Sequence, residues 1–262
     1  MTKVAFYGHG LPNVHKGDLP GKLIVLEGTD GVGRSTQVAL LREWLESSGY
    51  AVASSGLKRS GLAGKGISLA QEGHYLGDLT SCLFYASDLA DRLEREIIPA
   101  LRAGFVVLTD RYIYSLLARA LVRGVDQKWV RGVFGFALVP DKVFYLRAGL
   151  DHLIPRVLNA RGFNYWEAGM DFLPQRDYYD SYVEYQSRIL DQFDAISNFT
   201  GTVGSQIGRH SGQQPRRTFL TVRVQALDQV MRRLPRSEAL VRGGVPAGVQ
   251  LRPVVQLHLA GA

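Results

Sequence analysis

A nine-residue glycine-rich segment, Gly28 to Thr36, carries the strongest chemical signal in this sequence of 262 residues. It follows the spacing GxxxxGK[ST], in which glycines let successive backbone N–H groups point into one concavity. An apolar run at 23–26 precedes it and an apolar-periodic segment at 38–41 follows it, so the loop joins a buried strand to a helix. The helix adds its positive N-terminal end. The segment therefore predicts a polyphosphate-binding loop, in preference to a turn that merely connects two elements.

The expected triphosphate-binding residues are Gly28, Thr29, Asp30, Gly31, Val32, Gly33, Arg34, Ser35 and Thr36. Arg34 stands where the pattern has lysine; it keeps the positive charge but presents it on a planar fork instead of a compact ammonium. Ser35 is placed to bind the magnesium ion that accompanies the phosphates.

A second candidate site follows the apolar run 105–108, at Asp110 and Arg111. Open α/β sheets bind ligands at the carboxyl ends of their strands, where the glycine-rich loop also emerges. We expect Asp110 to hold magnesium or its waters and Arg111 to clamp a second phosphate. Alone, such a pair is as often only a surface ion pair.

Alternating apolar strands and amphipathic helices must position these residues. Strands are expected at 23–27, 50–53, 105–108 and 142–146, and helices at 35–47, 66–72, 78–103, 112–123, 150–160 and 177–196, with a loop at 161–176. This order predicts an α/β fold, a three-layer P-loop NTPase with a parallel sheet flanked by helices. Residues 21–198 form its domain, between an N-terminal extension (1–20) and an irregular C-terminal tail (199–262).

The net charge of +7 belongs entirely to the tail, which has nine arginines and two acidic residues. The rest of the chain has 22 basic and 22 acidic residues, so no specific nucleic-acid binding is expected. No apolar run is long enough to cross a membrane, and no signal peptide is evident. The lone Cys82 is interpreted as a small buried hydrophobe, which favours a cytoplasmic protein.

Four segments together resemble the thymidylate kinases, a family of P-loop nucleoside monophosphate kinases. They are Leu26 to Gln37, Leu83 to Asp88, Asp110 to Ser115 and Arg161 to Asp171, and the resemblance runs from about Lys22 to Asn198. The last segment is similar to the family's lid, which closes over ATP. The resemblance implies ATP and a deoxynucleoside monophosphate as substrates, Mg²⁺ as cofactor and a homodimer.

The resemblance also implies roles for individual residues. Arg34, Asp110 and Arg161 would be catalytic, with Ser35 and Asp110 at the metal and Arg156 as a further lid charge. The acceptor nucleotide would be bound by Asp30 at its 3′-hydroxyl, Arg111 and Arg59 at its phosphate, Tyr85 by stacking on its base, and Tyr165. Tyr85 on a leucine-rich helix is equally consistent with a core position.

The chain departs from the family where the base is read. The arginine that the family presents to thymine falls at Leu89, and Arg92, one turn further, is a conjectural substitute. Lys58 to Gly61 replaces an Arg-Glu-Pro-Gly motif, and Leu116, Leu117 and Arg119 replace pocket residues. The family's last strand and helix are not evident after Phe199, although 221–234 has helical spacing. A change of reading frame near residue 199 or a genuine basic extension would each explain this, and the DNA sequence distinguishes them.

The sequence therefore predicts a kinase that transfers the γ-phosphoryl group of ATP to dTMP, giving dTDP. Because the base pocket is altered, a kinase for a different nucleotide or nucleoside is the alternative. Because Arg34 replaces the usual lysine and the tail is unusual, a third hypothesis is a non-catalytic nucleotide-binding protein.

Overall fold

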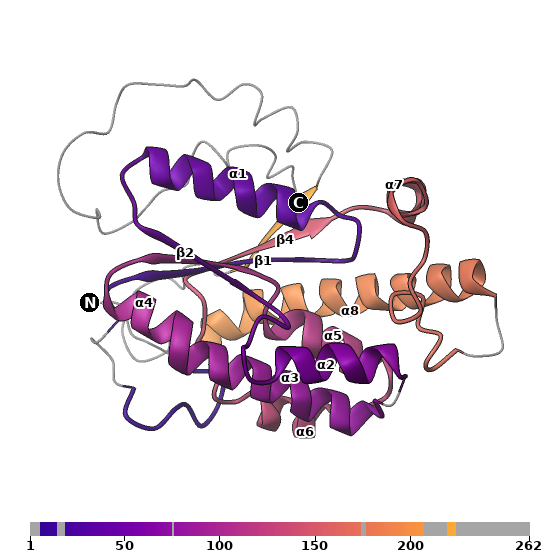
Figure 1. Ribbon diagram of the computed structural model, residues 1–262, viewed down its shortest axis with the longest axis horizontal. Coiled ribbons are helices and arrows are strands. Elements are labelled where there is room, and N and C mark those ends of the chain that lie inside the picture. Colours follow the sequence, from indigo (N-terminus) through magenta and orange to yellow (C-terminus); the bar gives the residue numbers. More distant parts are fainter. Residues whose placement is uncertain (1–5, 15–18, 75, 174–176, 207–218, 224–262) are drawn as a thin grey trace.

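The computed structural model describes residues 6–14, 19–74, 76–173, 177–206 and 219–223. At its centre lies a parallel sheet with the strand order β2-β3-β1-β4-β5. The strands are β1 (Lys22–Gly28), β2 (Val52–Gly56), β3 (Val106–Asp110), β4 (Lys142–Arg147) and β5 (Phe219–Arg223). Helices cover both faces of the sheet (Figure 1). The expected three-layer α/β fold is confirmed.

One helix, α1 (Arg34–Ser47), covers one face of the sheet, and most of the others lie on the opposite face (Figure 1). They are α2 (Gly64–Glu72), α3 (Asp78–Arg92), a π-helical turn η1 (Leu93–Ile97), α4 (Ile98–Arg102), α5 (Ile113–Val122), α6 (Gln127–Val133) and α8 (Tyr178–Gln206), whereas α7 (Leu150–Ala160) lies beyond the end of the sheet. The single helix expected at 78–103 is thus α3, η1 and α4 in succession. Helix α6 was not predicted, although Asp126 caps it by accepting a hydrogen bond from the Trp129 N–H at 2.7 Å.

Successive side chains of a strand point to opposite faces of the sheet, so the hydrophobic core is divided between those two faces. On β1, Ile24 and Leu26 pack with Leu41 and Leu45 of α1, whereas Leu23 and Val25 belong to the larger core beneath α3, α5 and α8. Because both faces are buried, the strands read as continuous apolar runs, which is why their positions could be predicted.

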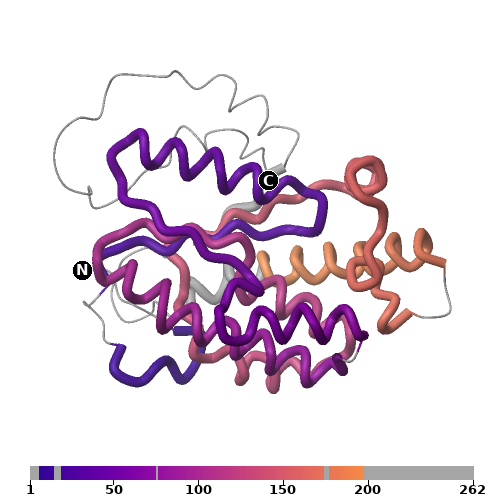
Figure 2. The backbone as a smooth tube through the Cα atoms, in the orientation of Figure 1, coloured from indigo at the N-terminus to yellow at the C-terminus, as the bar shows by residue number. Residues whose placement is uncertain are grey.

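The described part of the N-terminal extension, 6–14, packs on the face that carries α3 to α6 (Figure 2). Phe6 bridges to Leu138, the Tyr7 N–H donates to the Ala137 carbonyl at 3.0 Å, and the Tyr7 and Tyr114 hydroxyls are hydrogen bonded. This segment is therefore part of the folded body.

The chain beyond Phe199 differs from expectation. Helix α8 continues to Gln206, and β5 pairs with β4 in parallel from Val143–Phe219 to Arg147–Arg223. The expectation that no final strand follows Phe199 does not hold, and the helix expected at 221–234 cannot begin at 221; its remainder lies outside the described residues. The suggested change of reading frame rested on the apparent absence of both a last strand and a last helix. The presence of β5 removes the first of these grounds.

Candidate active site

The glycine-rich loop lies at the carboxyl end of β1 and leads directly into α1. Gly28, Gly31 and Gly33 have φ angles of 146°, 77° and 92°, a region that favours glycine, and the Gly33 carbonyl accepts the first hydrogen bond of α1 from the Gln37 N–H at 3.1 Å. A Cβ on Gly33 would have open space around it, whereas Val32 is buried. The loop therefore has an anchored side and an open side, as a phosphate cradle requires.

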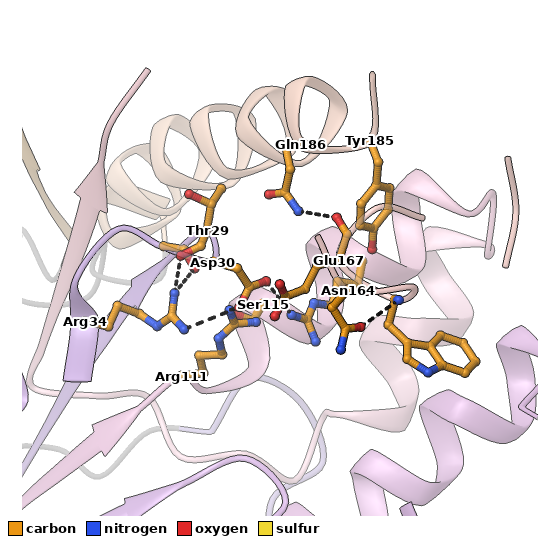
Figure 3. Close-up of polar contacts among 12 residues, drawn as sticks. Thr29, Asp30, Arg34, Arg111, Ser115, Asn164, Glu167, Tyr185 and Gln186 are labelled. Carbon is orange, nitrogen blue, oxygen red and sulfur yellow. Dashed lines mark hydrogen bonds and ion pairs between the residues drawn. The ribbon is translucent and has the colours of Figure 1, made fainter. Parts of the chain in front are cut away.

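Arg34, the first residue of α1, folds back over this loop (Figure 3). Its Nη1 donates to the Gly28 carbonyl at 2.7 Å and to the Thr29 carbonyl, and its Nε donates to Asp110 Oδ1 at 2.8 Å. A guanidinium can make these bonds simultaneously because its donors point in different directions. Arg34 thus joins the loop to the end of β3.

Ser35 and Asp110, the two expected magnesium ligands, are brought together. The Ser35 hydroxyl donates to Asp110 Oδ2 at 2.9 Å. A hydroxyl and a carboxylate are oxygen donors of the kind that Mg²⁺ prefers, and phosphates and water usually complete its coordination. No cluster of three or more His, Cys, Asp or Glu side chains that could hold a metal ion occurs among the described residues. The residues present fit a magnesium ion that is bound together with a polyphosphate.

Asp30, inside the glycine-rich loop, is surrounded by three arginines. Arg111 donates to its Oδ1, Arg119 of α5 donates to its Oδ2 at 3.1 Å, and Arg34 Nη2 lies 3.9 Å from its Oδ1 (Figure 3 shows the contact with Arg111). Burial raises the pKa of Asp30, but the charges of Arg111, Arg119 and Arg34 outweigh burial and hold it below its usual range. One carboxylate facing three guanidiniums leaves a positively charged site, which suits a multiply charged anion.

Arg111 has a strained backbone conformation, and a buried acid fixes the residue that follows it. Its φ of 71° is unusual for a residue other than glycine, and such conformations concentrate at functional sites. The next residue, Tyr112, donates its N–H to Glu27 at 2.7 Å, and the Ser115 hydroxyl donates to the same carboxyl group. Burial raises the pKa of Glu27, although these hydrogen bonds oppose the shift. Burial, together with the charge of Arg34, lowers the pKa of Arg111 to about 10.

A cavity lies beside the arginine cluster, between α2, α3, α5 and the loop after α7. It is lined by Gln71, Leu76, Asp78, Ser81, Cys82, Tyr85, Leu116, Arg119, Ala120, Arg123, Val125, Phe134, Trp166, Asp171 and Tyr185. Tyr85 is therefore both buried and at the cavity wall, and Cys82 is buried as expected. Apolar side chains and a few polar groups together are typical of a site for an aromatic ligand.

Neither of the two positions considered from the sequence for reading the base lines the cavity. Leu89 is fully buried in the core. Arg92, the conjectured substitute, does not line the cavity: its side chain is also fully buried, with Nε donating to Asp88 at 2.9 Å and Nη1 to Ser55 at 3.3 Å. Arg119, Arg123 and Gln71 line it instead. Of these three residues, only Arg119 stood out in the sequence, as a position where the chain departs from the family.

The loop after β2 places Lys58 beside Gln71 of α2, where the charges of Arg119 and Arg111 act on it. The Lys58 ammonium donates to Gln71 Oε1 at 2.8 Å, and burial with the charges of Arg119 and Arg111 lowers its pKa. Lys58 has a φ of 61°, and Asp88 accepts its N–H at 3.1 Å. The Arg59 guanidinium group lies against Gly56, at the carboxyl end of β2. The signal that could have favoured Lys58 is its position, which matches the arginine of the family's motif.

The three residues expected in or near the lid, Arg161, Arg156 and Tyr165, lie in different surroundings. Arg161 donates to both oxygens of Glu167 at 2.8 Å, and its charge acts on Asp30, so it lies near the phosphate site. Arg156 is exposed on α7. Tyr165 stacks on His74, with ring centres 3.8 Å apart, and does not line the cavity, whereas its neighbour Trp166 does.

This arrangement defines a class of protein. A glycine-rich loop, a hydroxyl–carboxylate pair and an arginine cluster at the carboxyl edge of a parallel sheet are the parts of a P-loop phosphotransferase. The family model of thymidylate kinase matches residues 26–188. The chain belongs to the thymidylate kinase family.

Individual relatives agree with this assignment. The chain is 37% identical over 191 residues to "Probable thymidylate kinase 2" of Saccharolobus solfataricus, covering 71% of this chain and 89% of the relative. It is 40% identical over 148 residues to "Probable thymidylate kinase" of Thermococcus kodakarensis, covering 53% and 72%. To "Thymidylate kinase" of Clavibacter sepedonicus it is 39% identical over 146 residues, covering 53% and 68%. Within the described residues, no helix has the length and apolar character needed to span a membrane.

Proposed function

We propose that this protein transfers the γ-phosphoryl group of ATP to dTMP and so forms dTDP. The observation that carries the proposal is the position of Asp30. This residue belongs to the phosphate-binding loop, and it is bonded by Arg111 from the end of β3 and Arg119 from α5. Donor and acceptor sites therefore share one residue, which brings two phosphorylated substrates to one place. Names of relatives and the family assignment support the choice of substrate.

Phosphoryl transfer depends on positioning and on stabilisation of negative charge. The loop backbone and the end of α1 bind the triphosphate, and Ser35 with Asp110 would hold Mg²⁺, which supplies positive charge to the phosphates. Arg111 and Arg119 bind and orient the acceptor phosphate, whose oxygen attacks the γ-phosphorus as the bond to the β-phosphate oxygen breaks. Arg161 adds charge from the lid, and lid closure excludes water.

Base recognition in the cavity is a separate part of the proposal. The Tyr85 ring stacks on the base, and its hydroxyl already accepts a hydrogen bond from Gln71 Nε2 at 3.1 Å. Because the Gln71 oxygen faces the Lys58 ammonium, its amide has a fixed orientation. An amide held in one orientation distinguishes the keto edge of thymine from the amino edge of cytosine.

The test is an assay of ADP release over a panel of nucleoside monophosphates and nucleosides, using protein that melts cooperatively. Turnover with dTMP well above the others supports the proposal. A preference for another acceptor supports the alternative kinase. Binding of ATP without any turnover, unchanged in Arg34→Lys, supports a non-catalytic nucleotide-binding protein.

We also propose a homodimer formed by α2 and α3. Exposed leucines gather on these helices and the loop before them: Leu62, Leu69, Leu79 and Leu83 are 75%, 67%, 57% and 51% exposed. Burying such side chains is favourable by about 1.5–3 kcal/mol each. Light scattering should give a dimer for the wild type and a monomer for Leu79→Glu/Leu83→Glu; a monomeric wild type would refute the proposal. Nucleotide substrates and a single buried thiol fit a reducing cytoplasm.

A further inference from the structure

The lid segment contacts the acceptor cavity as well as the phosphate site. Trp166 lines the cavity together with Tyr85 and Arg119. Its indole Nε1 donates to the Gln71 carbonyl at 3.0 Å, and its ring meets those of Tyr165 and His74 edge to face. Trp166 therefore closes the cavity between the lid and the end of α2.

The residue that follows Trp166 holds the lid arginine. Glu167 accepts two hydrogen bonds from Arg161, and its carbonyl accepts one from Gln186 Nε2 of α8 at 2.7 Å (Figure 3). Burial and the charge of Asp30 raise the pKa of Glu167, and Arg161 opposes that shift. Trp166 thus faces the acceptor cavity, and the next residue, Glu167, faces the phosphate site.

The segment that carries both residues is a compact series of turns. Asn164 Oδ1 accepts from the Trp166 N–H at 2.9 Å, and its carbonyl accepts from the Ala168 N–H at 2.8 Å. Gly169 has a φ of 67°, and a Cβ there would lie 2.7 Å from the Tyr185 ring, so the segment sits directly on α8. A displacement of Trp166 must therefore move Glu167, because little slack separates them.

We propose that Trp166 is a positioning residue that couples occupancy of the acceptor cavity to the placement of Arg161. The inference rests on the proposed kinase function. When a base is stacked on Tyr85, the Trp166 ring packs over it, and Glu167 then holds Arg161 at the phosphates. Without an acceptor, the Trp166 ring lacks this packing, so the lid holds Arg161 at the phosphates less firmly and ATP is activated less for attack by water.

The two competing reactions share one bond cleavage. In both, the bond between the γ-phosphorus and the β-phosphate oxygen of ATP breaks and ADP leaves. In transfer, a new bond forms to an oxygen of the acceptor phosphate; in hydrolysis, it forms to a water oxygen, which gives inorganic phosphate and releases a proton. Coupling through Trp166 favours transfer over hydrolysis.

The test compares Trp166→Ala and Trp166→Phe with Trp129→Phe, which removes an exposed tryptophan on α6. ADP and inorganic phosphate are measured with and without dTMP. We expect Trp166→Ala to raise the ratio of phosphate release to dTDP formation about tenfold, since misplacement of a group by about 1 Å costs up to 100-fold in rate. Trp166→Phe, which keeps a ring but loses the N–H, should lie between Trp166→Ala and the wild type. The KM for ATP should stay within about twofold, and Trp129→Phe should match the wild type. An unchanged ratio in a folded Trp166→Ala would overturn the proposal.

A fluorescence measurement separates this proposal from the proposed function. The chain has three tryptophans, at positions 44, 129 and 166, so Trp44→Phe/Trp129→Phe leaves Trp166 as the sole emitter. Monophosphates from the panel should shift its emission, and ATP alone should shift it less. If dTMP is not phosphorylated but another monophosphate both shifts the emission and is converted, the choice of dTMP fails and the coupling stands. If no monophosphate shifts the emission, the coupling is refuted even where dTDP is formed.

Discussion

The fully buried Arg92–Asp88 pair offers a sharp test of how the acceptor side is supported. Both side chains are 0% exposed, and Nε lies 2.9 Å from Oδ2. Asp88 also accepts the N–H groups of Lys58 and Ser60, at 3.1 and 3.0 Å, and so fixes the strained loop beside the arginine cluster. Arg92→Met leaves the Asp88 carboxylate buried without its counter-ion.

Breaking a buried pair in this way costs about 3–5 kcal/mol. The two backbone donors that remain on Asp88 place the expected loss near the lower limit, about 3 kcal/mol. For a domain of this size each kcal/mol lowers Tm by about 2–4 °C, so Tm should fall by about 6–12 °C. Because the Lys58 loop loosens, the KM for dTMP should rise more than the KM for ATP.

Thermal unfolding followed by circular dichroism, with steady-state kinetics well below Tm, measures both effects. Arg42→Met is the matched control, since the Arg42–Glu46 pair is 51% and 45% exposed and contributes about 0.5 kcal/mol or less. A Tm loss for Arg92→Met no larger than that of the control would refute the reasoning, as would equal rises in both KM values.

Three further outcomes are expected. Since the folded-state pKa of Asp30 lies below the ordinary value near 3.9, its ionised form stabilises the fold above about pH 4 and this contribution is lost as pH falls. Asp30→Asn should therefore melt below the wild type at pH 7, and the gap in Tm should begin to narrow below about pH 4 and narrow further as the pH falls toward the lowered folded-state pKa; a gap that stays constant across this range would contradict this. Burial and Asp78 raise the pKa of Cys82 to about 11, so its alkylation by iodoacetamide should speed up about tenfold per pH unit from pH 8 to 10. Mass spectrometry should show that dTMP, but not ATP alone, protects this single cysteine, and labelling indifferent to dTMP would exclude a base in the cavity. Arg34→Lys should lower the Mg²⁺ concentration for half-maximal activity, because one ammonium cannot hold Asp110 and two loop carbonyls together. A metal titration that matches the wild type would show that Arg34 does not compete for Asp110.

The sequence predicts those parts of the fold and site that depend on local pattern. Strands buried on both faces read as apolar runs, and the glycine-rich loop has a fixed place after one of them. Asp30 and Arg111, although 81 positions apart, could be expected near each other because parallel strands end at one edge. The observed contact agrees with that expectation.

Contacts that depend on how helices and turns pack could not be foreseen. Arg92 lies two turns beyond Tyr85 on α3, but Asp88 and Ser55 capture its guanidinium beneath the loop. From the sequence alone, either of the two aromatic rings, Tyr165 or Trp166, could line the cavity. The turn at Asn164 places Trp166 there. Strand β5 was obscured because apolar residues after it continue at helical spacing.

The pairing of β5 with β4 has a consequence for any shortened form of this chain. A chain that ends at Gln206 would keep every residue named at the site, but it would uncover the backbone edge of β4 from Val143 to Arg147. Exposed strand edges pair readily with strands of other molecules, which leads to aggregation. None of the site residues described above lies on β5, yet its loss would expose β4 to such pairing, so a shortened chain is expected to be less soluble than the full one.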